Sequence, residues 1–582
     1  MKRFIYTILV IILAAPTSIG QYYLKGEVKD EAGKPLPNAN ILQGSSGYMF
    51  HSGSSGGFGI TSSKKVDTLT FSLEGYQKAK QPVDAGIFSI VVLKKASGVK
   101  KSSGFKLSSL TKDLKRETQQ QWFAGDETYA SIIENQFISA QAYPSTGLTL
   151  NVDRASYSNI RRFLNTKSIV PPDAVRIEEM LNYFNFNYSE PAGGKTFEIN
   201  TVLTECPWNR TNQLMFATIK SKKVPLDKLP PSNLVFLIDI SGSMDMPNRL
   251  PLLKAGFRGL VNNLRDKDSV SIVVYGGTVG VMLDVTSGSE KQKIFNVIDS
   301  LQPGGATPGE SGIKLAYSVA RNHFIKGGNN RVILATDGDF NVGLRSENDL
   351  EELISNQQKS GIYLTCLGVG MGNYKDSKIQ TLAQKGNGNF AYIDSYAEAE
   401  KVLLTEFLQT LYAVADDVHL NVQFDPHFVK EYRLIGFDNK VGAIRDTSAT
   451  VEGGEIGSGF SMMVAIELTP SPANSSPGAE PVTFTLQYKL PNETKLHEFR
   501  EKPKLEYKPL LQQEKFYGFA CAVIHFGSLL RDSKFTKENS WNDVVELAEA
   551  SADPGIPSQA EFIALVQQAK SLYGKKRKKK EQ

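Results

Sequence analysis

An apolar run that ends in a group of oxygen-bearing side chains constrains this chain more than any other stretch. The run is Leu234–Ile238; it stops at Asp239, and Ser241 and Ser243 follow at alternate positions. A continuous apolar run of this length is typical of a buried parallel strand. In α/β sheets, ligands bind beyond the carboxyl ends of such strands. The pattern therefore predicts an α/β sheet that presents one carboxylate and two hydroxyls at one rim.

These side chains supply hard oxygen ligands, which suit Mg²⁺ in octahedral coordination at about 2.0–2.1 Å, with Mn²⁺ or Ca²⁺ as alternatives. The pattern Asp239-x-Ser241-x-Ser243 resembles the metal-ion-dependent adhesion site (MIDAS) of von Willebrand factor type A (VWA) domains. The resemblance implies two further ligands, a Thr in a Gly-rich loop and an Asp that closes a later strand. Thr307 and Asp337 match these two positions in the expected order.

The stretch 232–412 alternates strand-like apolar runs with helix-like segments, which predicts a mostly parallel sheet covered on both faces. The expected strands are Leu234–Ile238, Val270–Tyr275, Val279–Leu283, Val332–Ala335, Tyr363–Leu367 and Phe390–Ile393. The expected helices lie near 250–264, 290–301, 311–325, 348–359, 376–385 and 396–412. We therefore predict a doubly wound, Rossmann-like VWA domain at 232–412 within a multidomain chain, as the length of 582 residues requires.

The segment 134–231 before this domain has motifs of its own. Pro172 is followed by apolar residues at close to helical spacing, which predicts an amphipathic helix; they are Val175, Ile177, Met180, Leu181 and Phe184. The segment resembles the one that precedes the VWA domain in YfbK-type bacterial proteins. Residues 413–574 are predicted to be β-rich and then helical, and they resemble the C-terminal region of the same family through Tyr432–Phe437 and Gly454–Gly459.

The N-terminus has the parts of a secretory signal at 1–20, with Lys2 and Arg3 before an apolar stretch and small residues after it. We expect cleavage before Gln21, with an uncleaved anchor as the alternative. Residues 21–96 read as short strands separated by turns, and the motif from Gly26 to Ile41 resembles the carboxypeptidase-regulatory-like (carboxypeptidase D regulatory-like) β-sandwich. That resemblance implies a spacer or docking unit. The polar stretch 97–133 is predicted to be a linker.

The formal charge of +5 comes from the C-terminus. Without residues 575–582, which hold six basic residues and Glu581, the chain has 60 basic and 60 acidic residues. A neutral body gives no reason to expect a nucleic-acid partner. The basic tail has two interpretations, a contact with an anionic membrane surface or a solvated terminus. We expect the three cysteines to be small buried side chains. The alternative is that two of them form one disulfide bond in an oxidising compartment.

Charged residues in 134–231 allow two interpretations. These residues are Asp153, Arg161, Arg162, Arg176 and Glu178. They could form a catalytic cluster. They could instead form buried or interface ion pairs, which is the interpretation we favour. The six histidines form no His-x-x-x-His pair and none stands in the predicted metal loops. A phosphate-binding loop is absent from the sequence. The sequence therefore indicates a binding protein without enzyme activity.

The VWA resemblance implies that the metal keeps much of its charge and accepts a Glu or Asp from a protein partner. With the predicted signal, this makes the chain an exported protein that is periplasmic, outer-membrane associated or secreted. Two alternatives stay open: an envelope scaffold in which the metal only stabilises the fold, and a hydrolase with its site in the flanking segments. The sequence does not specify the oligomeric state or the identity of the partner.

Overall fold

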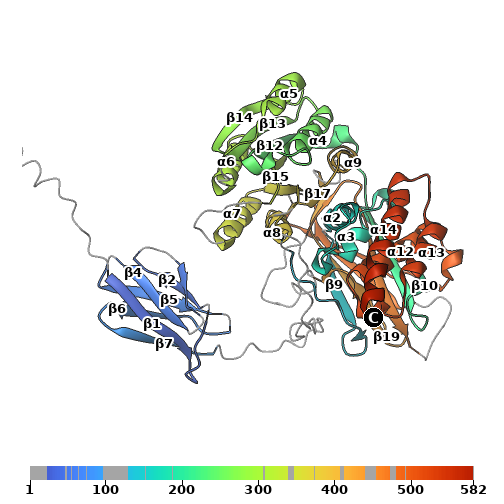
Figure 1. Cartoon of the computed structure of the whole chain (residues 1–582), viewed down its shortest axis with the longest axis horizontal. Helices are drawn as coiled ribbons and strands as arrows, with labels where there is room; N and C mark the ends of the chain where they lie inside the picture. Colours follow the sequence, from blue (N-terminus) through green and yellow to red (C-terminus); the bar gives the residue numbers. More distant parts are fainter. Residues whose placement is uncertain are drawn as a thin grey trace, which may run out of the picture. The chain divides into compact units, whose positions relative to one another are not determined.

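The computed structural model describes residues 22–37, 39–45, 49–53, 56–62, 64–73, 75–95, 127, 129–150, 152–186, 188–305, 309–338, 347–371, 374–406, 412–438, 454–471, 480–491 and 493–580. The predicted signal peptide, most of the predicted linker and Thr307 lie outside these residues. The chain forms two compact units, Met1–Gly104 and Phe105–Gln582 (Figure 1). None of the described helices combines the length and the apolar character that crossing a bilayer requires.

The N-terminal unit is a β-sandwich. One sheet has the order β4 (Gly57–Ser62), β1 (Tyr22–Asp30), β7 (Phe88–Leu93), and the other has β3 (Met49–His51), β2 (Asn40–Gln43), β5 (Val66–Ser72), β6 (Ala79–Asp84). Alternate residues of the strands point inward, and both sheets contribute to one core, as Leu24 and Phe71 illustrate. The predicted all-β sandwich is thus confirmed, while its carboxypeptidase-regulatory-like character stays a prediction.

The central layer of the second unit is a six-stranded sheet of order β14-β13-β12-β15-β16-β17. All neighbours are parallel except β14, which runs antiparallel at one edge. The strands are β12 (Ser232–Asp239), β13 (Ser269–Gly276), β14 (Thr278–Ser287), β15 (Asn329–Thr336), β16 (Ile362–Val369) and β17 (Phe390–Ile393). Every residue of β12 is buried, as expected for a parallel strand covered on both faces.

Helices cover both faces of this sheet (Figure 1). They are α4 (Leu250–Asn262), α5 (Lys291–Ser300), α6 (Gly309–Asn322), α7 (Glu347–Lys359), α8 (Asp376–Lys385) and α9 (Tyr396–Glu400). Phe236 of β12 packs into the core shared with α4, α5 and α9, whereas Val235 packs into the core shared with α6, α7 and α8. The predicted doubly wound domain is therefore confirmed.

The last helix of this domain differs from the prediction of a single helix at 396–412. It is α-helical only to Glu400 and continues as one π-helical turn, Lys401–Thr405. The turn is closed by a hydrogen bond from the Glu406 N–H to the Lys401 carbonyl, five residues back. No Pro or Gly marks this change of helix type in the sequence, so periodicity could not reveal it.

The segments before and after the VWA domain build two sheets together. One has the order β10-β11-β21-β19-β8; the other has β20-β18-β22-β23, with β9 paired to β18. Their strands are β8 (Ile138–Ser139), β9 (Ser145–Thr149), β10 (Phe197–Glu205), β11 (Gln213–Ser221), β18 (Ala413–Phe424), β19 (Val429–Ile435), β20 (Gly454–Gly457), β21 (Ser461–Pro470), β22 (Val482–Lys489) and β23 (Leu496–Glu501). Phe216 of β11 lies opposite Ala465 of β21. This sheet therefore pairs two strands that the whole VWA domain separates in the sequence.

Helices cover the outer face of the first of these sheets. They are α2 (Ala155–Asn165), α3 (Ile177–Leu181), α12 (Lys515–Leu530), α13 (Trp541–Ser551) and α14 (Pro557–Lys580). The predicted β-rich and then helical C-terminal region is confirmed. The backbone of α14 continues into the basic residues 575–580, whose side chains lie outside the described part of the chain.

The amphipathic helix predicted from Pro172 to Phe184 is interrupted. A short 3₁₀ turn covers Pro172–Ala174, α3 covers Ile177–Leu181, and Arg176 between them is extended. The Arg176 N–H donates to the Ser156 hydroxyl, and its guanidinium pairs with Glu179 and Asp376. Tertiary partners therefore override the local helical pattern.

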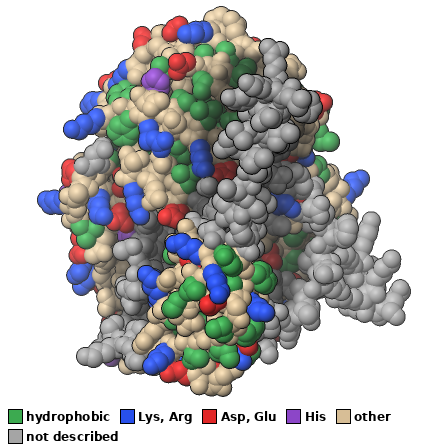
Figure 2. Space-filling view, turned by 90° about the vertical axis from the view of Figure 1, so that its left-hand side faces the viewer, with side chains coloured by type: hydrophobic (Ala, Val, Ile, Leu, Met, Phe, Trp, Pro, Cys, Tyr) green, Lys and Arg blue, Asp and Glu red, His purple; other side chains and the backbone are tan. Residues whose placement is uncertain are grey.

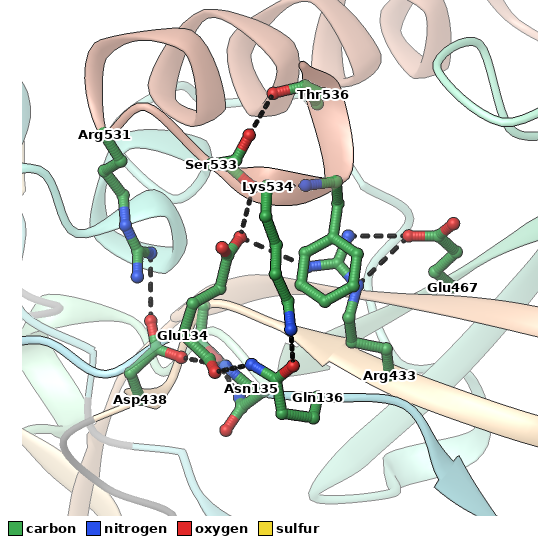
Figure 3. Close-up of polar contacts among 12 residues, drawn as sticks. Glu134, Asn135, Gln136, Arg433, Asp438, Glu467, Arg531, Ser533, Lys534 and Thr536 are labelled. Atoms are coloured by element: carbon green, nitrogen blue, oxygen red, sulfur yellow. Dashed lines mark hydrogen bonds and ion pairs between the residues drawn. The ribbon is translucent and has the colours of Figure 1, made fainter. Parts of the chain in front are cut away.

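A buried polar network joins residues 134–136, β19 and the turn after α12 (Figure 3). Arg433 of β19 pairs with Glu467 at 2.6 Å and lies 3.9 Å from the centre of the Phe535 ring. Ser533 donates to Glu134. Because every group in this network has a partner, buried charge here costs less than its burial alone would suggest.

Candidate metal site

The predicted metal ligands lie at the carboxyl ends of two neighbouring parallel strands. Asp239 is the last residue of β12, and Ser241 and Ser243 follow in a loop with one 3₁₀ turn, Gly242–Met244. Asp337 comes directly after β15. Since Ile238 of β12 is opposite Ala335 of β15, the two aspartates stand on the same rim of the sheet.

Hydrogen bonds hold the first carboxylate and the serines in place. The Ser241 N–H donates to Asp239 Oδ1 at 2.9 Å, and the Thr336 hydroxyl donates to Asp239 Oδ2 at 3.1 Å. The hydroxyl oxygens of Ser241 and Ser243 are 3.1 Å apart. The loop therefore gathers a carboxylate and two hydroxyls with little freedom to reorient.

The Gly-rich loop that carries Thr307 is bonded to the serine loop. The Gly304 N–H donates to the Ile240 carbonyl at 2.7 Å, and the Gly242 N–H donates to the Gly305 carbonyl at 3.1 Å. Gly305 has a φ of 79°, and a Cβ there would lie 2.1 Å from the Cα of Gly277. Only glycine fits this close approach of the two backbones. Gly305 stands two residues before Thr307 in the sequence.

The two aspartates are fully buried. Burial raises the pKa of Asp239 to about 6, and the negative charge of Asp337 adds to this effect against the lowering by hydrogen bonds from Ser241. A site that concentrates two carboxylates away from water gains from a nearby positive charge. Such a charge is what a bound cation supplies.

Arg249 also reaches this rim. Its Nη1 donates to Asp337 Oδ2 and to the Ser243 carbonyl, both at 2.6 Å, and its Nη2 donates to the Met371 carbonyl at 3.0 Å. Arg249 could not be recognised as a site residue from the sequence, because an Arg just before a helix carries no signal of a site. Its role became visible only once the fold brought Asp337 next to it.

The residues present fit a small divalent cation. Adjacent ligands of an octahedral ion at about 2.1 Å lie about 3 Å apart, which agrees with the spacing of the two serine hydroxyls. Among the described residues, no group of three or more His, Cys, Asp or Glu side chains is placed to hold a metal. The fit therefore depends on Asp239 and Asp337 together with neutral hydroxyls.

The charged residues of 134–231 are not brought to this rim; four of the five have hydrogen-bond or ion-pair partners elsewhere. Arg161 pairs with Asp394, Glu398 and Glu561, Arg162 with Glu127, and Arg176 with Glu179 and Asp376, while Asp153 accepts from the Phe390 N–H. Glu178 is buried. The geometry agrees with the interface ion pairs favoured from the sequence.

All three cysteines are free and buried. Burial raises the pKa of each thiol, which leaves them unreactive.

On the face shown in Figure 2, described basic and acidic side chains are interspersed. This face has the mixed charge that the neutral body of the chain indicated.

Comparison with known proteins agrees with the fold. The protein-family model described as von Willebrand factor type A domain matches residues 233–406. A second family model, described as von Willebrand factor, matches residues 124–216. Together with the strand order, these matches define a VWA-domain protein. Proteins with VWA domains mediate protein–protein interactions, often through a MIDAS.

A third model, described as Uncharacterized protein YfbK, C-terminal, matches residues 409–572. The Escherichia coli (strain K12) protein described as Uncharacterized protein YfbK is 36% identical over 472 residues, which are 76% of this chain and 81% of that protein. The chain belongs to the YfbK family.

More distant similarities are confined to parts of the chain. The Synechocystis protein described as Uncharacterized protein sll0103 is 26% identical over 204 residues, 34% of this chain and 46% of that protein. A solved von Willebrand factor type A structure from Catenulispora acidiphila covers 63% of this chain and 88% of its own, at 14% identity and a TM-score of 0.38. The sheet topology and the family matches establish the fold.

Proposed function

We propose that this protein is an exported binding protein that holds Mg²⁺ through Asp239, Ser241, Ser243, Thr307 and Asp337 and uses it to grip an acidic side chain of a protein partner. The observation that carries the proposal is the pair of buried aspartates beside two serine hydroxyls 3.1 Å apart. Bound Mg²⁺ would supply a Lewis-acidic coordination position for a carboxylate oxygen.

The protein's own groups prepare that position. The Ser241 N–H and the Thr336 hydroxyl orient the two oxygens of Asp239. The neutral serine hydroxyls add ligands without adding negative charge, so the cation retains an attraction for one more anionic oxygen. Thr307 and the metal itself are the predicted parts of this arrangement.

The proposal includes the absence of enzyme activity at this rim. None of the loops that carry Asp239, Ser243 and Asp337 holds a histidine to act as a general base, and both aspartates are assigned to the metal. Export is supported by the basic and apolar composition of residues 1–20. Intact-mass analysis of protein recovered from the producing cells should show an N-terminus at Gln21.

Calorimetric titration of the purified protein with Mg²⁺ tests the metal site. Wild type should bind one Mg²⁺, and Asp239→Asn, which removes a charged ligand while keeping its shape, should lose at least about 90% of the affinity. Lack of binding by a folded wild-type protein, both without and with a carboxylate such as acetate in the buffer, would contradict the site.

Partner binding separates the adhesive role from a scaffold role. Recovery of a partner from envelope extracts on immobilised protein should be lost in EDTA and lost with Asp239→Asn. If the variant melts at a lower temperature but recovers the same partner, the metal serves only the fold. A hydrolase screen with and without Mg²⁺ should be negative.

A further inference from the structure

Arg249 is built into the metal rim rather than lying at the surface. It stands immediately before α4, and only 7% of its side chain is exposed. Its guanidinium bridges Ser243, Asp337 and Met371, which belong to three different loops of the rim. An ordinary surface arginine makes no such set of contacts.

The surrounding backbone leaves room for this side chain. Gly370 has a φ of 79°, and a Cβ there would lie 2.5 Å from Arg249 Nε. The Tyr392 hydroxyl donates to the Gly370 carbonyl and so holds this loop against the sheet. The guanidinium therefore occupies a prepared position.

The position of Arg249 changes the net charge of the rim. Asp239 and Asp337 contribute two negative charges, and Arg249 contributes one positive charge in direct contact with Asp337 at 2.6 Å. With Arg249 the metal-free rim has a net charge of −1, and a divalent cation would make it +1. Without Arg249 the two states would be −2 and 0, so a metal-loaded rim would attract a carboxylate less strongly.

We propose that Arg249 is a resident counter-cation of the metal site, which holds Asp337 in the metal-free protein, weakens the binding of Mg²⁺ alone and favours Mg²⁺ together with a carboxylate. This inference rests on the proposed function and deepens it. Arg249 is a positioning residue, since its contacts are to the ligand Asp337 and to the backbone of the rim. It makes metal binding and partner binding depend on each other.

Mg²⁺ titration of Arg249→Gln tests the inference. The variant should bind Mg²⁺ at least about fivefold more tightly than wild type, because one repelling positive charge is removed. The matched control is Arg258→Gln on the same helix. Arg258 pairs with Asp299 at the surface, so this control changes the net charge equally and should leave Mg²⁺ affinity within twofold.

Two further readouts separate charge from packing. Arg249→Lys keeps the charge but cannot make all the contacts of the planar guanidinium, so its Mg²⁺ affinity should stay closer to that of wild type than the affinity of Arg249→Gln does. Sodium acetate at constant ionic strength should tighten Mg²⁺ binding by wild type and have no such effect on Arg249→Gln. The melting temperature of Arg249→Gln should be lower than that of wild type in EDTA and recover with Mg²⁺.

The outcomes are distinct. Equal or weaker Mg²⁺ binding by Arg249→Gln, with wild type binding normally, would overturn the Arg249 inference and leave the metal site standing. No binding by either folded protein would overturn the proposed function and the inference with it. Binding of Mg²⁺ by Arg249→Gln without acetate, with binding by wild type only when acetate is present, would support the inference. If Arg249→Gln does not fold, Arg249→Met, of similar length, repeats the neutralisation under the same criteria.

Discussion

Glu178 is a carboxyl group placed where it is more stable without its charge. It is buried on α3, and its Oε2 has no hydrogen-bond partner among the described residues. Burial, followed by the charges of Asp438 and Glu179, raises the pKa of Glu178 to about 7 from an ordinary value of 4.5. The folded protein therefore binds a proton here that the unfolded chain has released between these two pH values.

This shift predicts a pH dependence of stability. The contribution of Glu178 is fully present below pH about 4.5 and is lost as the pH rises through about 7. Glu178→Gln removes the titrating group, so the variant should be more stable than wild type by about 1–3 kcal/mol at pH 8 and nearly equal to it at pH 4.5. Urea unfolding at both pH values measures this, and an equal difference at both would refute it. Glu179→Gln is the contrasting control, because it weakens the pair with Arg176.

Two adjacent glycines allow a test of the metal loop. Gly305 is left-handed and meets Gly277, whereas a Cβ at Gly304 would meet nothing within 4 Å. Gly305→Ala should weaken Mg²⁺ binding and destabilise the fold by about 1–3 kcal/mol, and Gly304→Ala should change both much less. Calorimetric titration and thermal melting compare them. Similar behaviour of the two variants would mean that the close approach is not what shapes the loop.

At the scale of elements, the predictability of the chain follows the range of the interactions. The central strands of the VWA sheet were predictable because they are largely apolar runs between turns. The break before α3 was not, because Arg176 finds Asp376 two hundred residues away. The same holds for Arg249, whose partner Asp337 lies 88 residues further along the chain.

The candidate metal site was predictable only in part. Asp239, Ser241, Ser243 and Asp337 come together because parallel strands end at a common edge, a rule that the sequence pattern already invokes. Thr307 lies outside the described residues, so its role remains a prediction. The positive charge of Arg249 beside Asp337 could not be predicted from the sequence. A resemblance to a ligand motif does not show which other groups the fold places beside the ligands.

The ion pair between β19 and β21 gives a stability prediction. Arg433 neutralises the buried Glu467, so Arg433→Met should destabilise the protein by about 3–5 kcal/mol by leaving that carboxylate without its charged partner. The double variant Arg433→Met/Glu467→Gln should recover part of the loss. Denaturant unfolding measures both. The exposed pair of Arg258 is the control, and Arg258→Met should stay within about 0.5 kcal/mol of wild type.

At the scale of the whole molecule, the two compact units differ in how self-sufficient their parts are. The N-terminal sandwich has a core made only of its own residues. The VWA domain, by contrast, relies on preceding residues to neutralise buried acids: Arg161 pairs with Asp394 and Glu398, and Arg176 with Asp376. Its charge balance is completed from outside its own boundaries.

This difference predicts how fragments behave. A fragment of residues 21–96 should fold alone with a cooperative thermal transition. A fragment of residues 232–412 should melt at a lower temperature than the same domain within residues 127–582, because two buried carboxylates and the half-buried Asp394 lose their arginine partners. Circular dichroism melts compare the three. Equal melting temperatures for the domain in both contexts would show that these ion pairs contribute little.

The pairing of β11 with β21 has a consequence for how the protein is made. The two strands are joined through Phe216 and Ala465, so the first must wait for about 240 further residues to be synthesised before its neighbour exists. The VWA domain lies between them, with the Ser232 hydroxyl at one end donating to the Tyr412 hydroxyl at the other. Whether the chain emerges from the ribosome or from the export channel, β10 and β11 are available before β21, so their hairpin has an unpaired strand edge until β21 arrives.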